Sequence, residues 1–148
     1  MKLKTLMATT AALAAGTLFA QSGDASNETE LPMKIKITVN GQTTLNAVLE
    51  DNATARAFAA KLPVTLPMTD LYDREMCFNF PEALPANEAR TRGYEVGEII
   101  YYPPLHSFVI MYAQNGERFR MQSVGRVDGN VGIFADAGDA DVRFEAAD

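Results

Sequence analysis

One stretch decides the fold of this chain: Asn52-Ala53-Thr54-Ala55-Arg56-Ala57-Phe58-Ala59-Ala60-Lys61-Leu62-Pro63. Its alanines and basic residues are good helix formers, and Phe58 and Leu62 share one helix face because they are spaced four apart. Asp51 or Asn52 can accept the free amide hydrogens at the start, and Pro63 ends the helix. The stretch predicts a helix over Ala53 to Lys61.

The segment before the helix predicts a β-hairpin. From Met33 to Val39, apolar residues alternate with polar ones, which is typical of a half-buried strand. Asn40-Gly41 follows, and both residues tolerate the positive φ of a type I′ turn. We therefore expect Gln42 to Leu49 to return as the partner strand.

The segment after the helix predicts a series of short strands. Strands are expected at Val64 to Leu71, Glu75 to Phe80, Glu98 to Tyr102, Ser107 to Tyr112, Glu117 to Val124 and Val142 to Phe144. Pro81 to Arg92 is expected to be a loop, and Gly129 to Ala137 to hold one short helical turn. Asn115-Gly116 predicts a tight turn with strand pairing after it. Many short strands with one good helix favour a β-barrel or a sandwich.

Two further motifs decide between barrel and sandwich: Gly97-Glu98-Ile99-Ile100-Tyr101-Tyr102-Pro103-Pro104 and Val124-Gly125-Arg126-Val127-Asp128. With the helix stretch, in this order and spacing, they resemble the small bacterial cyclophilin-like domains, over about Met33 to Phe144. The resemblance implies a mainly β fold, a closed barrel of about eight strands with one main helix plugging an end and one short helix. Most members of this family have no assigned activity.

The first twenty residues have the layout of a secretory signal peptide. Lys2 and Lys4 precede an uncharged run that Ala20 ends, and the run is too short and alanine-rich for a stable membrane span. Cleavage after Ala20, or as late as Ala25, would leave a flexible linker up to residue 32 and a domain over residues 33–146. The alternative is an N-terminal helix of the mature chain. We expect export, to the periplasm or beyond the cell.

Composition excludes several classes of function. The 148 residues are 47% hydrophobic, as in one ordinary globular domain, and the net charge is −6. None of the 13 Lys and Arg residues forms a run, which argues against nucleic acid and against an anionic membrane surface. One His and one Cys do not make a zinc site, and the acidic residues near the C-terminus lack the spacing of a calcium loop. No metal or cofactor is expected.

The single cysteine, Cys77, cannot form an internal disulfide. It lies among Met76, Phe78 and Phe80, whereas reactive thiols need an electropositive setting. A buried structural thiol is therefore favoured over a reactive one.

Weak or absent isomerase activity is expected from the residues present. The resemblance implies where isomerase residues would lie. In prolyl isomerases an arginine on the strand after the first helix holds the prolyl carbonyl, and aromatic and glutamine side chains line a pocket on the outer barrel face. Here Val64 to Asp70 contains no arginine, and Ser107 and Val109 stand where the glutamine and an aromatic residue are expected. That chemistry is electrostatic and needs a donor, so no catalytic residue is assigned.

Two functions remain open. The preferred one is a non-catalytic binding module of the cell envelope that takes a peptide or small ligand in an outer groove between the Tyr72 to Phe80 region and the Tyr101 to Ser107 hairpin. Its oligomeric state is open. The alternative is a divergent peptidyl-prolyl cis-trans isomerase in which Arg74 replaces the missing arginine. The candidate groove residues are Arg74, Phe78, Phe80, Tyr101, Tyr102, His106 and Ser107. Strand alternation requires about half of the aromatic residues to fill the core instead.

Overall fold

The computed structural model describes residues 31–148. The expected signal peptide, residues 1–20, and most of the expected linker, residues 21–32, lie outside the described residues. The strands are β2 (Met33–Val39), β3 (Thr43–Leu49), β4 (Val64–Leu71), β5 (Glu75–Asn79), β6 (Arg90–Gly93), β7 (Glu98–Tyr102), β8 (Ser107–Met111), β9 (Arg118–Asp128) and β10 (Ala140–Ala146). The helices are α2 (Ala53–Ala59), the 3-10 turn η3 (Pro103–Leu105) and α3 (Ile133–Ala137).

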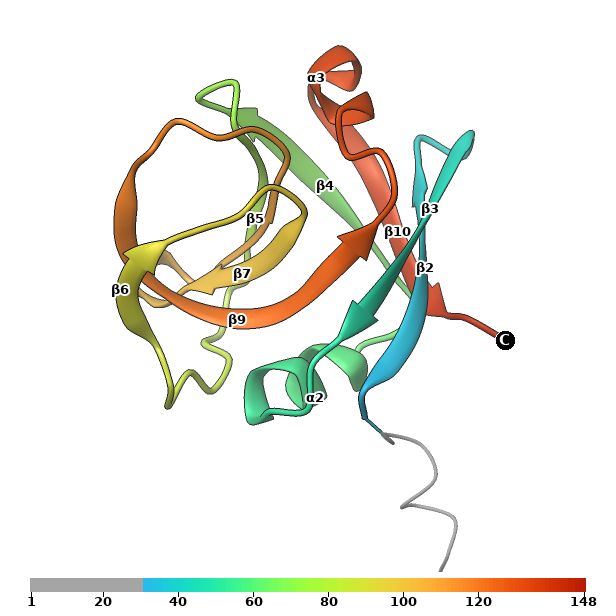
Figure 1. The fold of residues 1–148 in the computed structure, drawn as a ribbon. Helices are drawn as coiled ribbons and strands as arrows, with labels where there is room; N and C mark the ends of the chain where they lie inside the picture. Colours follow the sequence, from blue (N-terminus) through green and yellow to red (C-terminus); the bar gives the residue numbers. More distant parts are fainter. Residues whose placement is uncertain (1–30) are drawn as a thin grey trace, which may run out of the picture. The chain divides into compact units, whose positions relative to one another are not determined.

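The strands form a closed antiparallel barrel (Figure 1). Eight of them follow the order β3-β2-β10-β4-β5-β8-β7-β9, and β9 pairs again with β3. The ninth, β6, pairs only with the beginning of β9. The predicted fold class, a mainly β barrel with one main and one short helix, is confirmed.

The barrel closes where β9 meets β3, and Gly125 makes that approach possible. Gly125 lies opposite Leu49, and a Cβ atom on Gly125 would lie 2.4 Å from the carbonyl oxygen of Val48. Real Cβ atoms do not come so close to a backbone atom. The glycine within the motif Val124-Gly125-Arg126-Val127-Asp128 is therefore required by the closure of the barrel.

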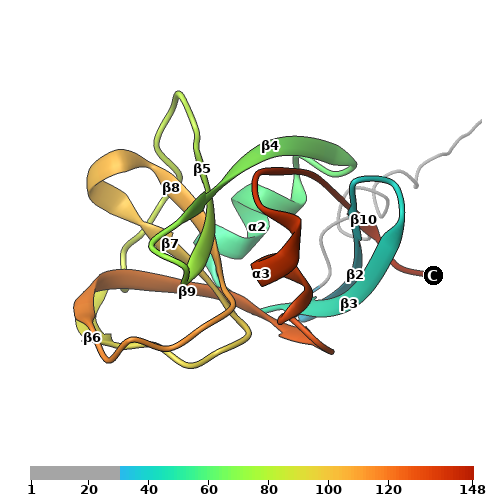
Figure 2. The same cartoon turned by 90° about the horizontal axis from the view of Figure 1, so that it is seen from above.

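Helix α2 fills one end of the barrel. Asn52 caps it, since the Asn52 Oδ1 atom accepts a hydrogen bond of 2.8 Å from the Ala55 amide. Phe58 is fully buried and stacks on Phe108, with ring centroids 4.1 Å apart. Burial of such a side chain stabilises the fold by roughly 1.5–3 kcal/mol. Figure 1 shows α2 and α3 at opposite ends of the barrel, and in the view from above both lie within the ring of strands (Figure 2).

Two local predictions are wrong. The end of the expected loop Pro81 to Arg92 belongs to β6, a four-residue strand that has no alternating pattern and depends on pairing with β9. The turn at Asn115-Gly116 does not join a hairpin, because β8 pairs with β5 and β7 while β9 pairs with β6, β7 and β3. Side chains hold that turn instead, as the Glu117 amide donates to Asn115 Oδ1. Within residues 31–148, no helix has both the length and the apolar character needed to cross a membrane.

Candidate functional site

A hollow of about 570 Å³ lies on the outer face of the barrel, over β5 and β8. Strand alternation explains which side chains reach it. On β8, Phe108 and Ile110 point into the core, while Ser107 and Val109 point outward and line the hollow. The sequence resemblance placed Ser107 and Val109 on the face that isomerases use, and both line this hollow.

The wall of the hollow is partly apolar, and two of its side chains reach into solvent. Tyr72 has 72% of its surface exposed and Leu105 has 60%, the largest values among the large hydrophobic residues of the described chain. They come from different turns, one between β4 and β5 and the other between β7 and β8. Single exposed apolar residues are ordinary, whereas here two of them line one hollow.

Both turns contain side-chain-bearing residues in the left-handed region. Tyr72 has φ 58°, Asp73 has φ 49° and His106, which follows Leu105, has φ 57°. For a bulky residue this conformation is unusual and costs of order 1–3 kcal/mol. Residues in this conformation cluster at functional sites, and here they lie in the two turns that present Tyr72 and Leu105.

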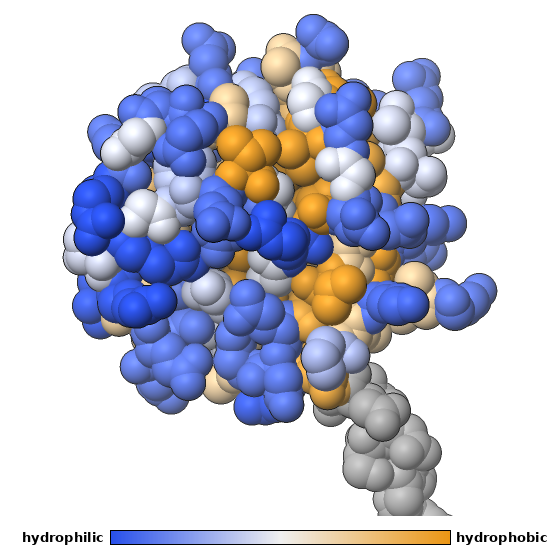
Figure 3. All heavy atoms as spheres, viewed as in Figure 1, coloured by the Kyte–Doolittle hydropathy of each residue, from blue (hydrophilic) through white to orange (hydrophobic). Residues whose placement is uncertain are grey.

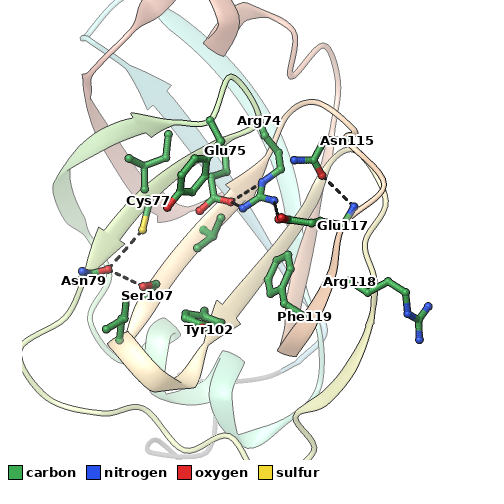
Figure 4. A pocket seen from close by; sticks show the side chains of 14 residues that line it. Arg74, Glu75, Cys77, Asn79, Tyr102, Ser107, Asn115, Glu117, Arg118 and Phe119 are labelled. Atoms are coloured by element: carbon green, nitrogen blue, oxygen red, sulfur yellow. Dashed lines mark hydrogen bonds and ion pairs between the residues drawn. The ribbon is translucent and has the colours of Figure 1, made fainter.

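Arg74 lies at the centre of a buried polar cluster (Figure 4). Only 6% of its surface and 6% of that of Glu75 is exposed. The Nε atom donates to Glu75 Oε1 over 2.8 Å and Nη2 donates to the same oxygen, while Nη1 donates to Glu117 Oε1. The guanidinium also lies 5.0 Å from the ring centre of Tyr72 and 5.3 Å from that of Phe119. Its donors are thus directed at two carboxylates.

These contacts change the acid–base properties of the cluster. Burial lowers the pKa of Arg74, but its hydrogen bonds to Glu117 and Glu75 outweigh burial and raise that pKa above the ordinary value. Burial raises the pKa of Glu75 even though Arg74 opposes this. Arg74 therefore stays charged at all physiological pH values, and Glu75 depends on it for a counterion.

The other end of the hollow is polar and uncharged. Asn79 Oδ1 accepts a 2.6 Å hydrogen bond from the Ser107 hydroxyl and a longer one, 3.4 Å, from the Cys77 thiol. Burial raises the pKa of Cys77, which keeps the sulfur protonated near neutral pH. The predicted burial of Cys77 is confirmed.

The structure brings three of the seven predicted groove residues to the hollow: Arg74, Tyr102 and Ser107. Phe80 and Tyr101, contrary to expectation, are buried in the core, where the Tyr101 hydroxyl accepts a hydrogen bond from the Leu84 amide. Phe78 packs against the core as well, because strand alternation turns it inward. His106 lies beside the hollow without lining it, with Nδ1 3.2 Å from the Phe80 carbonyl oxygen.

Tyr72 and Leu105 lie in the two segments predicted to border the groove, although neither was named singly, and Glu117, Arg118 and Phe119 were missed. One signal was available, since Tyr72 occupies a two-residue turn that Asn or Gly would fill without strain. Glu117, Arg118 and Phe119 reach the hollow only because the strand order brings the beginning of β9 to it, which local sequence does not reveal.

A second hollow, of about 350 Å³, lies near the beginning of α2. Its polar groups bind one another: Arg92 donates to Glu98 and to the Ser123 hydroxyl, and Gln122 accepts from the Glu88 amide. Burial alone would raise the pKa of Glu98, but the hydrogen bond and charge of Arg92 outweigh burial and hold that pKa below its ordinary value. Because these groups satisfy one another within the fold, the second hollow is the weaker candidate for a ligand site. No group of three His, Cys, Asp or Glu residues in the described part of the chain is placed to hold a metal ion.

Known proteins share this sequence pattern and fold. The model of the cyclophilin-like family matches residues 37–145. The fold is similar to that of a hypothetical protein from Archaeoglobus fulgidus, determined in solution, with a TM-score of 0.61 and 18% identity over 79% of this chain and 96% of that one. At this identity the likeness shows the fold alone. No curated protein is similar enough to the chain to count as a relative.

Proposed function

The chain belongs to the cyclophilin-like family, and from that premise we propose that it is an exported, non-catalytic binding module of the cell envelope. The hollow on the outer barrel face is its site for a peptide or small ligand. The supporting observation is that Tyr72 and Leu105, the two most exposed large hydrophobic residues of the described chain, both line this hollow. Ligand sites combine such apolar area with a few placed polar groups, which Asn79 and Ser107 supply.

Export is the part of the proposal that depends on residues 1–20. The support is the order of a positive segment, an uncharged run and a small residue, Ala20. N-terminal sequencing of the protein recovered from cells tests it. Gln21 or Ser26 at the N-terminus supports export, whereas a chain that still begins with Met1 contradicts it.

A divergent prolyl isomerase is the second candidate, because Arg74 lines the hollow beside Tyr72 and Phe119. An isomerase polarises the prolyl amide with a donor that is free to reach the substrate. In Arg74, the Nε, Nη1 and Nη2 atoms already donate to Glu75 and Glu117. We therefore place this candidate second.

We expect no prolyl isomerisation above the uncatalysed rate. The measurement is a protease-coupled assay on a set of short X-Pro peptides, with an active cyclophilin on the same peptides as the positive control. The reason is the engagement of Arg74 by two carboxylates. Turnover that an Arg74→Lys variant loses would favour the isomerase, since lysine keeps the charge without the forked donors.

A further inference from the structure

The two carboxylates that bind Arg74 differ in how firmly they are held. Glu75 is buried, with 8% of its side chain exposed, and it takes the Nε and Nη2 side of the guanidinium. Glu117 has 65% of its side chain exposed and takes the Nη1 side. One counterion is therefore fixed inside the protein, and the other lies at the mouth of the hollow.

Hydrogen bonds hold the backbone at Glu117, so the Glu117 side chain can move away from Arg74 without a change in the loop. The Glu117 amide donates to Asn115 Oδ1 over 3.0 Å, and the Asn115 amide donates to the Tyr94 hydroxyl over 2.9 Å. The same hydroxyl donates to the Ala113 carbonyl. In Figure 4, Glu117 reaches from this loop toward Arg74. An ion pair with one exposed partner contributes little, which makes its exchange easy.

The hollow contains a second arginine, Arg118, although the whole chain carries a charge of −6. Within residues 31–148, Arg90, Arg118 and Arg120 have no acidic group at ion-pair distance, and all three lie on the paired strands β6 and β9. Arg118 also lines the hollow, with its guanidinium extending away from it (Figure 4). Figure 3 shows hydrophilic residues gathered over this side of the barrel. The unpaired charge of Arg118 at the hollow favours an approaching anion.

Aromatic rings lie next to Arg74, and further apolar groups line the same hollow. Phe119 and Tyr102 pack edge to face, with ring centroids 5.8 Å apart, and both line the hollow with Tyr72 and Leu105. An apolar group held next to the guanidinium would bury these surfaces. The hollow thus offers an arginine with an exchangeable counterion beside an apolar wall.

Building on the proposed function, we infer that the ligand carries a carboxylate that replaces Glu117 on Arg74, next to an apolar or aromatic group that packs against Tyr102 and Phe119. Glu117 moves into water, where its charge is solvated, and the number of charges in the hollow stays the same. One charge-assisted hydrogen bond to Arg74 replaces another, so the favourable binding free energy comes from burial of the apolar group. A peptide ending in an apolar residue and a small aromatic acid share this chemistry.

The test is a titration of the full chain with three probes, followed by NMR or calorimetry. The probes are N-acetyl-Leu-Phe with a free carboxylate, its C-terminal amide, and 3-phenylpropanoate. We expect the free acid to bind more tightly than the amide. In a Glu117→Gln variant we expect acid binding to become tighter by about three- to tenfold, because a competing charge is removed. Amide binding should change by less than about twofold.

Asp136→Asn is the matched control, because it removes another exposed carboxylate, on α3. It should leave the affinities of all probes unchanged. Binding by the dipeptide acid alone points to a peptide, and binding by 3-phenylpropanoate as well points to a small acid. Equal affinities of acid and amide, with no response to Glu117→Gln, overturn the inference while leaving a ligand site in place. Failure of all three probes also overturns it, and the proposed function then depends on the mapping experiment described below.

Discussion

Replacing Gly125 by alanine is expected to destabilise the protein by about 3 kcal/mol or more, since overpacking costs typically 1–3 kcal/mol and a backbone neighbour cannot move aside. The added Cβ would lie 2.4 Å from the Val48 carbonyl oxygen and 3.2 Å from the Leu49 Cα, both on β3. To relieve this contact, β9 must separate from β3 and open the barrel. Urea unfolding, followed by circular dichroism, measures the change.

Gly93→Ala is the control for this prediction. Gly93 also lies in a paired strand, but a Cβ there meets only the Arg118 side chain, at 4.0 Å. Alanine should therefore leave stability unchanged or raise it by up to about 1 kcal/mol, because it lowers the conformational entropy of the unfolded chain. Equal effects of the two substitutions would contradict the account of barrel closure.

Arg74→Met is expected to cost about 3–5 kcal/mol of stability, the usual penalty for removing one partner of a buried ion pair. It leaves the Glu75 carboxylate, with 6% of the residue exposed, without its counterion. The double variant Arg74→Met/Glu75→Leu should recover most of the loss, because it removes both charges together. Arg143→Met is a suitable control, since the Arg143 side chain is 47% exposed in its pair with Glu145. It should change stability by less than about 1 kcal/mol.

The penalty in Arg74→Met should also depend on pH. Burial already raises the pKa of Glu75, and loss of Arg74 removes the group that opposes the rise. A raised pKa means that the folded state binds the proton more tightly than the unfolded chain, whose glutamate pKa is about 4.3. The variant is therefore most stable below the unfolded pKa of about 4.3. It loses stability as the pH rises from there through the raised pKa of Glu75 in the folded state. A deficit that is the same at pH 4 and pH 7 would contradict the role given to Glu75.

Local signals made most of the barrel predictable. Asn40 and Gly41 have φ values of 51° and 69°, as the type I′ turn requires, and the predicted hairpin around them forms. Asn52 caps the predicted helix, and Phe58 fills the core. These features depend on residues close in sequence, where turn chemistry and periodicity act directly.

The hollow was less predictable because its residues meet only through strand order. Arg74 was predicted as a groove residue, but nothing in the local sequence indicates that Tyr72, Tyr94 and Phe119 cover it. Tyr94 and Phe119 come from segments that the barrel brings together through the pairing of β6 with β9. A strand as short as β6 has no sequence signal of its own, so neither its pairing nor the cover over Arg74 could be derived from periodicity.

The measurement that tests the central claim most directly is an NMR screen of isotope-labelled protein against small organic fragments and dipeptides, with each hit mapped onto residues. A Tyr72→Asn variant is the comparison, because asparagine tolerates the φ of 58° and should fold at least as stably while lacking the exposed ring. The account predicts that hits shift the signals of Tyr72, Leu105 and Ser107 and weaken in the variant. Hits that gather on another face of the barrel, or bind the variant equally well, would contradict it.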